Sequence, residues 1–95
     1  MIPIITERAA QDINQLFEFH SEGNAQHIAN EIIRQVETLE DFPLFGRSRD
    51  ELKIGLRSFI VQKYVVFYHI WQNTPVVIRV VHGSRDLEAL FSKES

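Results

Sequence analysis

The sequence predicts an α+β fold: an antiparallel helix hairpin packed on a curved, mostly antiparallel sheet. Two observations support this. Residues 7–39 place apolar side chains at helical spacing, with one break at His20–Asn24. Residues 55–82 form three β-branched and aromatic runs separated by short polar breaks. The expected order is β-α-α-β-β-β with a short C-terminal helix, and residues 1–95 are expected to form a single domain.

The first elements follow from local signals. Ile2–Ile5 is apolar, and Pro3 cannot donate a hydrogen bond within a sheet interior, which predicts an N-terminal edge strand. Thr6 can cap the first helix, and either Ser21 or Asn24 can cap the second. The second helix is expected to bury one apolar face, made of Ala25, Ile28, Ala29, Ile32, Val36 and Leu39.

The second half of the chain is expected to be a meander of three strands. The second helix should end before Phe42–Pro43, which opens a polar connector to Lys53. A tight turn at Gln62–Lys63 would pair Val61 with Tyr64. Beyond the next turn, Gln72–Pro75, Trp71 is expected to pair with Val76. The last segment, 84–91, is expected to be a short helix capped by Ser84.

This register predicts a row of Arg57, Tyr68 and Arg79 across the three strands. Two guanidinium groups beside a tyrosine ring could hold a phosphate or an acidic partner. The structural alternative is that each arginine stacks on Tyr68 and pairs with a helix carboxylate such as Glu31. The same face is expected to carry Phe59, Val61, Tyr64, Val66, Ile70, Val77 and Val81.

The opposite face of the sheet is also expected to be apolar. It would carry Leu56, Ser58, Ile60, Val65, Phe67, His69, Trp71, Ile78, Val80 and His82. The helices can cover only one face, so the C-terminal segment and a partner chain are expected to cover the other.

Composition restricts the function. The chain has no cysteine, which excludes disulfides and thiol chemistry and fits a reducing cytoplasm. No apolar run could span a membrane, and the first residues do not resemble a signal peptide. The net charge is −3, with the acidic excess in the first half and a basic excess in the second. Direct nucleic-acid binding is therefore not expected, whereas an acidic partner would favour the second half.

The histidines do not predict a metal site, because His20 and His27 lack ligand spacing and His69 and His82 lack a nearby carboxylate. No cofactor or catalytic residue is predicted. Ser84 beside His82, with Asp86 following, offers a nucleophile and a base, but residues so close in sequence cannot easily adopt triad geometry. Gly83 is expected to supply a positive φ at the end of the last strand.

Three stretches together resemble the ParE branch of the RelE/ParE toxin superfamily. They are "DFPLFGRSRDEL", "GLRSFIVQKYVVFYHI" and "IRVVHGSRDL". The resemblance extends over nearly the whole chain, although Ser84 replaces the usual alanine, and Ile60 and Gln62 replace the usual proline and glycine of the hairpin. It implies a toxin encoded beside an antitoxin that binds and neutralises it, as in plasmid stabilization systems.

The resemblance is compatible with two activities. RelE-like members cleave mRNA on the ribosome with lysines, arginines and a C-terminal tyrosine, whereas ParE-like members are associated with inhibition of DNA gyrase. This chain keeps Lys53 and Arg85 but has Gly55, Val65 and Phe91 at the other positions. Without those charges a phosphate in the transition state is poorly stabilised, so an enzyme is not expected.

The resulting hypothesis is a cytoplasmic ParE-like gyrase inhibitor that acts by protein binding and forms a hetero-oligomer with its antitoxin. The alternatives are a ribosome-dependent endoribonuclease, for which some relatives use histidine and His82 is available, or a degenerate toxin that only binds antitoxin. The candidate contacts with gyrase or the antitoxin are Arg57, Arg79, His82 and Arg85. The matched positions favour a sheet in which Arg57 and Arg79 face the helices, whereas the charge of these residues favours the open face.

Overall fold

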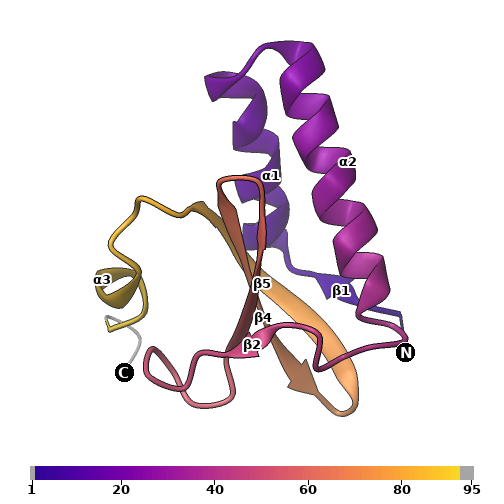
Figure 1. The fold of residues 1–95 in the computed structure, drawn as a ribbon, viewed down its shortest axis with the longest axis vertical. Helices are drawn as coiled ribbons and strands as arrows, with labels where there is room; N and C mark the ends of the chain where they lie inside the picture. Colours follow the sequence, from indigo (N-terminus) through magenta and orange to yellow (C-terminus); the bar gives the residue numbers. More distant parts are fainter. Residues whose placement is uncertain (1, 93–95) are drawn as a thin grey trace.

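The computed structural model describes residues 2–92 and has the predicted α+β architecture (Figure 1). Its elements are β1 (Ile4–Ile5), α1 (Glu7–Phe19), α2 (Glu22–Thr38), β2 (Arg47–Ser48), β3 (Arg57–Val61), β4 (Tyr64–Trp71), β5 (Thr74–His82) and α3 (Leu87–Ser92). The strands form one sheet in the order β1-β5-β4-β3-β2, with β1 parallel to β5 and the other neighbours antiparallel. The short strand β2 lies in the predicted connector and was not expected.

Both long helices begin at hydroxyl caps. The Thr6 hydroxyl accepts the Ala9 amide at 3.2 Å, and the Ser21 hydroxyl accepts the Asn24 amide at 3.3 Å. Ser21 is therefore the cap of α2, which begins at Glu22 and includes Gly23 in its first turn. The two helices lie side by side against one face of the sheet (Figure 1).

The main core lies between these helices and the sheet. The predicted face of α2 is buried there, as are Leu16 of α1 and Tyr68 of β4. The strand side of this core consists of Phe59, Val61, Val66, Tyr68, Val77 and Val80. The edge position of β1 and the pairing of Val61 with Tyr64 are confirmed.

The pairing of β4 with β5 differs from the prediction in two ways. The turn is the two-residue Gln72–Asn73, so Trp71 pairs with Thr74 rather than with Val76. The register then shifts once, because Tyr68 pairs with Val77 and Phe67 with Arg79, leaving Ile78 as an extra residue. Such a bulge exchanges the faces of all side chains beyond it.

The bulge decides which β5 side chains meet the helices. Val80 and His82, expected on the opposite face, lie on the helix face beside Val66 and Tyr64. Val81 lies opposite Val65, on the other face. The row Arg57–Tyr68–Arg79 does not form, because Val77 occupies the position opposite Tyr68 and Arg79 lies opposite Phe67.

The other face of the sheet carries a second, smaller core. Its buried side chains are Leu56, Val65, Phe67, Val81 and Phe91, and Leu52, Ile78, Leu87 and Leu90 pack around them. Helix α3 thus covers the centre of this face, as Figure 1 shows on the side opposite α1 and α2. Ile60 and Trp71 remain exposed on it.

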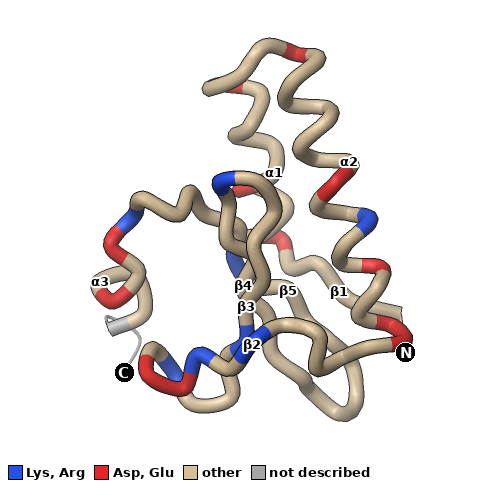
Figure 2. The backbone as a smooth tube through the Cα atoms, viewed as in Figure 1, with Lys and Arg blue, Asp and Glu red and all other residues tan. Residues whose placement is uncertain are grey.

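Acidic positions are spread along α1 and α2, whereas the strands carry mainly basic charges (Figure 2). Within residues 2–92, no helix combines the length and the hydropathy that a membrane span requires.

Candidate functional site

Arg57 is engaged with the connector rather than with Arg79. Its guanidinium donates to the carbonyl oxygens of Gly46 at 2.8 Å and Leu44 at 3.2 Å. The Tyr68 hydroxyl donates to the Pro43 carbonyl and accepts the Gly46 amide, both at 2.8 Å. These bonds fix the connector against the sheet.

Arg79 is held by a carboxylate from α1. Its Nε donates to Asp12 at 2.8 Å, and Arg8 donates to the same carboxylate at 3.0 Å from one helical turn away. Asp12 also accepts the Val80 amide at 2.9 Å. The Asp12 side chain is only 3% exposed, so this buried charge is matched by two guanidiniums and a backbone donor.

The Asp12 cluster was not predicted. Glu31, the carboxylate expected to pair with the arginines, pairs instead with Arg34 on its own helix. The signal that could have identified Asp12 is its position four residues before Leu16, which places the two side chains on one side of the helix. A buried acid at such a position needs a cation from another element.

The corner after β5 differs from its predicted structure. Gly83 does not have a positive φ. Asp86, rather than Ser84, caps α3, because its carboxylate accepts the Ala89 amide at 3.1 Å. Ser84 instead lies against His82, with its amide 3.1 Å and its hydroxyl 2.7 Å from Nδ1. Because Nδ1 accepts that amide, a neutral His82 carries its proton on Nε2.

Two histidines flank Tyr64 beside this corner. The Tyr64 hydroxyl is hydrogen-bonded to His20 Nε2 at 2.8 Å, and the His82 ring meets the Tyr64 ring edge-on at a centroid distance of 5.4 Å. Burial raises the pKa of the Tyr64 phenol. The cluster joins α1, β4 and β5, and no spacing in the sequence indicates it. Among residues 2–92 no three potential ligand side chains are placed to hold a metal.

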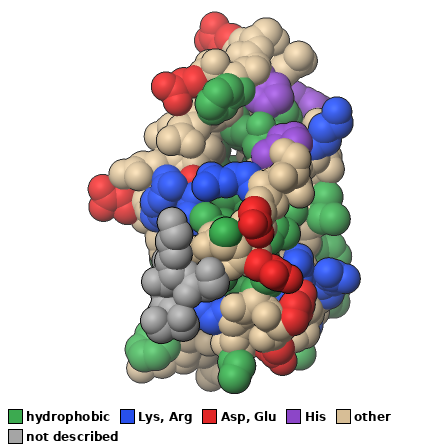
Figure 3. All heavy atoms as spheres, turned by 90° about the vertical axis from the view of Figure 1, so that its left-hand side faces the viewer, with side chains coloured by type: hydrophobic (Ala, Val, Ile, Leu, Met, Phe, Trp, Pro, Cys, Tyr) green, Lys and Arg blue, Asp and Glu red, His purple; other side chains and the backbone are tan. Residues whose placement is uncertain are grey.

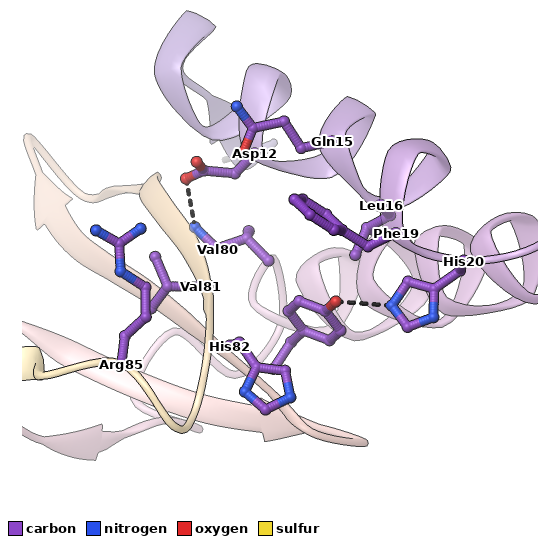
Figure 4. A pocket seen from close by; sticks show the side chains of 10 residues that line it. Asp12, Gln15, Leu16, Phe19, His20, Val80, Val81, His82 and Arg85 are labelled. Carbon is purple, nitrogen blue, oxygen red and sulfur yellow. Dashed lines mark hydrogen bonds between the residues drawn. The ribbon is translucent and has the colours of Figure 1, made fainter.

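A cleft of about 440 Å³ opens beside this cluster, between α1 and the end of β5 (Figure 4). Its lining residues are Asp12, Gln15, Leu16, Phe19, His20, Tyr64, Val80, Val81, His82 and Arg85. Figure 4 shows the Phe19 side chain over the middle of the cleft and Arg85 at its other side. Figure 3 shows histidine and basic side chains gathered beside hydrophobic ones on the face that carries α3.

The predicted site residues therefore separate into two groups. Arg57 and Arg79 hold internal partners, whereas His82 and Arg85 are exposed and line the same cleft. Within residues 2–92 the Arg85 guanidinium has no hydrogen bond or ion pair, and Asp86, the local partner considered for it, is used as a helix cap. Arg85 is thus available to an external anion.

Val65 and Phe91, at two positions where this chain lacks the ribonuclease residues, lie elsewhere, on the face covered by α3. Val65 is 6% exposed and Phe91 is 5% exposed, both within the second core. The rings of Phe67 and Phe91 meet at a centroid distance of 4.7 Å. Gly55 is in a turn with φ of 86°. This part of the face is therefore filled by hydrocarbon.

The helix hairpin on an antiparallel sheet is the architecture implied by the resemblance to the RelE/ParE toxin superfamily. A family model described as "ParE toxin of type II toxin-antitoxin system, parDE" matches residues 4–87. The chain therefore belongs to the ParE toxin family of type II toxin–antitoxin systems.

Individual relatives agree with this assignment. Toxin ParE3 of Caulobacter vibrioides (strain ATCC 19089 / CIP 103742 / CB 15) is 29% identical over 96 residues, which cover 97% of this chain and 96% of the relative. A solved structure described as "Chromosomal ParDE TA system from P. aeruginosa" has a TM-score of 0.74 at 17% identity, covering 86% of this chain and 95% of that one. The structural likeness shows the shared fold.

Proposed function

We propose that this chain is the toxin of a type II pair that inhibits DNA gyrase by protein binding and is neutralised in the cytoplasm by a cognate antitoxin. The observation that supports protein binding over RNA cleavage is the packing of Val65 and Phe91 in the second core. The resemblance to RelE-like ribonucleases would require an arginine and a tyrosine at these positions.

Charge distinguishes the two activities. Cleavage of RNA without a metal needs cations around the phosphate and a group that exchanges a proton. Valine and phenylalanine supply neither, and both side chains are buried in the second core. Inhibition by binding needs only a complementary surface and no group that exchanges a proton.

A second candidate is a ribosome-dependent endoribonuclease centred on His82. The observation that favours it is that His82 and Arg85, a proton-exchanging group and a cation, line one cleft. The Ser84 contacts leave His82 Nε2 available for proton transfer.

One pair of assays separates the two candidates. Purified toxin is added to gyrase with relaxed plasmid, and in parallel to a translation extract in which mRNA 3′ ends are mapped. Loss of supercoiling with accumulated DNA breaks, reversed by the cognate antitoxin, is expected. Cleavage of mRNA at the ribosomal A site with intact gyrase activity would overturn the proposal.

The His82→Ala variant is compared with the wild type in both assays, because it removes the proton-exchanging group of the second candidate. It is expected to leave mRNA intact, as in the wild type. If the wild type cuts mRNA and His82→Ala does not, the second candidate is correct. If neither assay responds while antitoxin still binds, the chain is a toxin without either activity, and the gyrase proposal is wrong.

A further inference from the structure

The cleft lies at a strand edge that no other strand covers. Strand β1 pairs only with Val76 and Val77, so within residues 2–92 the rest of β5 has no strand neighbour on the α1 side. The Val80 amide points to this side, because Asp12 of α1 accepts it. Beyond Val80, this edge of β5 borders the cleft lined by His82 and Arg85.

The floor of the cleft is apolar. Leu16 and Val80 are buried beneath it, whereas Phe19, which lies over the middle of the cleft, is 77% exposed. A large aromatic side chain this exposed beside a concave apolar surface is typical of a site that another molecule covers. A bulky apolar group entering the cleft would bury both the floor and the Phe19 ring.

The free charge at the cleft is positive. Asp12 is the acid in the lining, but Arg8 and Arg79 already neutralise it. Within residues 2–92 no carboxylate pairs with Arg85. A carboxylate placed here would form a charge-assisted hydrogen bond without displacing an internal contact.

We propose that this cleft holds a segment of the cognate antitoxin that inserts a bulky apolar side chain above Leu16 and Val80 and places a carboxylate against Arg85. The proposal rests on the proposed function in taking the antitoxin as the partner. An apolar floor supplies the buried area of a durable complex, and one unpaired cation at its border fixes the orientation of an acidic segment. Gyrase is the other possible occupant, and the experiment distinguishes it.

The test uses two substitutions in the cleft, each with a matched control. Gln15→Trp fills the cleft from an exposed position on α1, and Gln11→Trp adds the same bulk one turn earlier, outside the lining. Arg85→Glu reverses the free charge. Arg47→Glu makes the same change on β2, at the opposite edge of the sheet.

The affinity of the purified antitoxin is measured by calorimetry, and inhibition of gyrase is measured for every variant. Gln15→Trp and Arg85→Glu are each expected to raise the antitoxin Kd roughly tenfold or more, with less than about threefold for the controls. Unchanged affinity in both cleft variants would overturn the proposal. Equal losses of antitoxin affinity in Arg85→Glu and Arg47→Glu would also overturn it. The change in the net charge of the protein, acting at long range, would then explain the effect.

The outcomes separate this proposal from the proposed function. If wild-type toxin inhibits gyrase and is neutralised, but the cleft variants bind antitoxin normally, the function stands and the cleft assignment fails. If the cleft variants bind antitoxin normally and lose gyrase inhibition, the occupant is gyrase and the assignment also fails. If wild-type toxin does not inhibit gyrase while the cleft variants lose antitoxin affinity, the cleft assignment stands and the gyrase proposal fails.

Discussion

Asp12 on α1 and Arg79 on β5 form an ion pair, with a carboxylate oxygen 2.8 Å from Nε, across 67 positions of the sequence. The same oxygen accepts the Val80 amide just beyond the bulge. The pair therefore fixes α1 to the part of β5 that lies beyond β1. It also places the end of β5 so that His82 and Arg85 reach the cleft.

Asp12→Ala is expected to lower the free energy of unfolding by about 3 kcal/mol, because it leaves Arg79 desolvated without a partner. Urea denaturation followed by circular dichroism measures the loss. Glu18→Ala, at an exposed position of the same helix, is the control and should change stability by less than about 0.5 kcal/mol. A similarly small change for Asp12→Ala would show that the pair contributes little to the fold.

Gly46 is required by the close approach of Tyr68. A Cβ at this position would lie 2.6 Å from Cε1 of Tyr68 and 2.8 Å from the Ser58 carbonyl oxygen. Gly46→Ala is therefore expected to cost about 1–3 kcal/mol of stability and to loosen the connector.

Gly23→Ala is the matched control, because a Cβ there meets no atom within 4 Å and alanine favours the first turn of α2. The midpoint of thermal unfolding is expected to fall for Gly46→Ala and to rise or stay unchanged for Gly23→Ala. Wild-type stability in Gly46→Ala would contradict the packing at Tyr68.

The sequence predicts the helices and the main core because their signals are local. Hydroxyl caps, the apolar face of α2 and the pairing of Val61 with Tyr64 depend on neighbours a few residues apart. The bulge at Ile78 depends instead on how β5 fits between β4 and α1, and no turn residue marks it. Because the sequence does not indicate this extra residue, the predicted register places Val80 and His82 on the face opposite to the one that they occupy.

The candidate site could be predicted only in part for the same reason. His82 and Arg85 lie three positions apart in the sequence and reach one cleft, whereas Arg57 and Arg79 were grouped by a register that the bulge breaks. The contact of His20 with Tyr64 joins residues 44 positions apart, and nothing local specifies it. Long-range pairs of polar groups depend on tertiary packing, which residue spacing does not encode.

The β3–β4 turn contains a residue in an unfavourable backbone conformation. Gln62 has a φ of 55°, a region in which a side chain costs roughly 1 kcal/mol and glycine does not. Gln62→Gly is therefore expected to raise the free energy of unfolding by about 0.5–1 kcal/mol, measured by urea denaturation. Lys63→Gly, at the neighbouring position without a positive φ, should not stabilise the protein. Equal effects of the two substitutions would argue against strain at Gln62.

Ionisation of the Tyr64 phenol makes the free energy of unfolding depend on pH in the alkaline range. Burial raises the pKa of Tyr64 above its usual value of 10.0, so the native state binds this proton more tightly than the unfolded chain does. The resulting stabilisation is complete below about pH 10 and is lost as pH rises toward the native pKa. Tyr64→Phe removes the titrating group together with its hydrogen bond to His20, so the variant should be less stable at pH 8.

Urea denaturation of both proteins between pH 8 and 11 tests this dependence. The stability difference between wild type and Tyr64→Phe is expected to narrow as the pH passes 10, because the wild type alone loses the Tyr64 contribution. Absorbance of tyrosinate assigns the effect, since the chain has 2 tyrosines and Tyr68 is the one that Tyr64→Phe retains. A stability difference that stays constant over this pH range would mean that the phenol titrates alike in the folded and unfolded states. The hydroxyl of Tyr64 would then contribute through its bond to His20 alone.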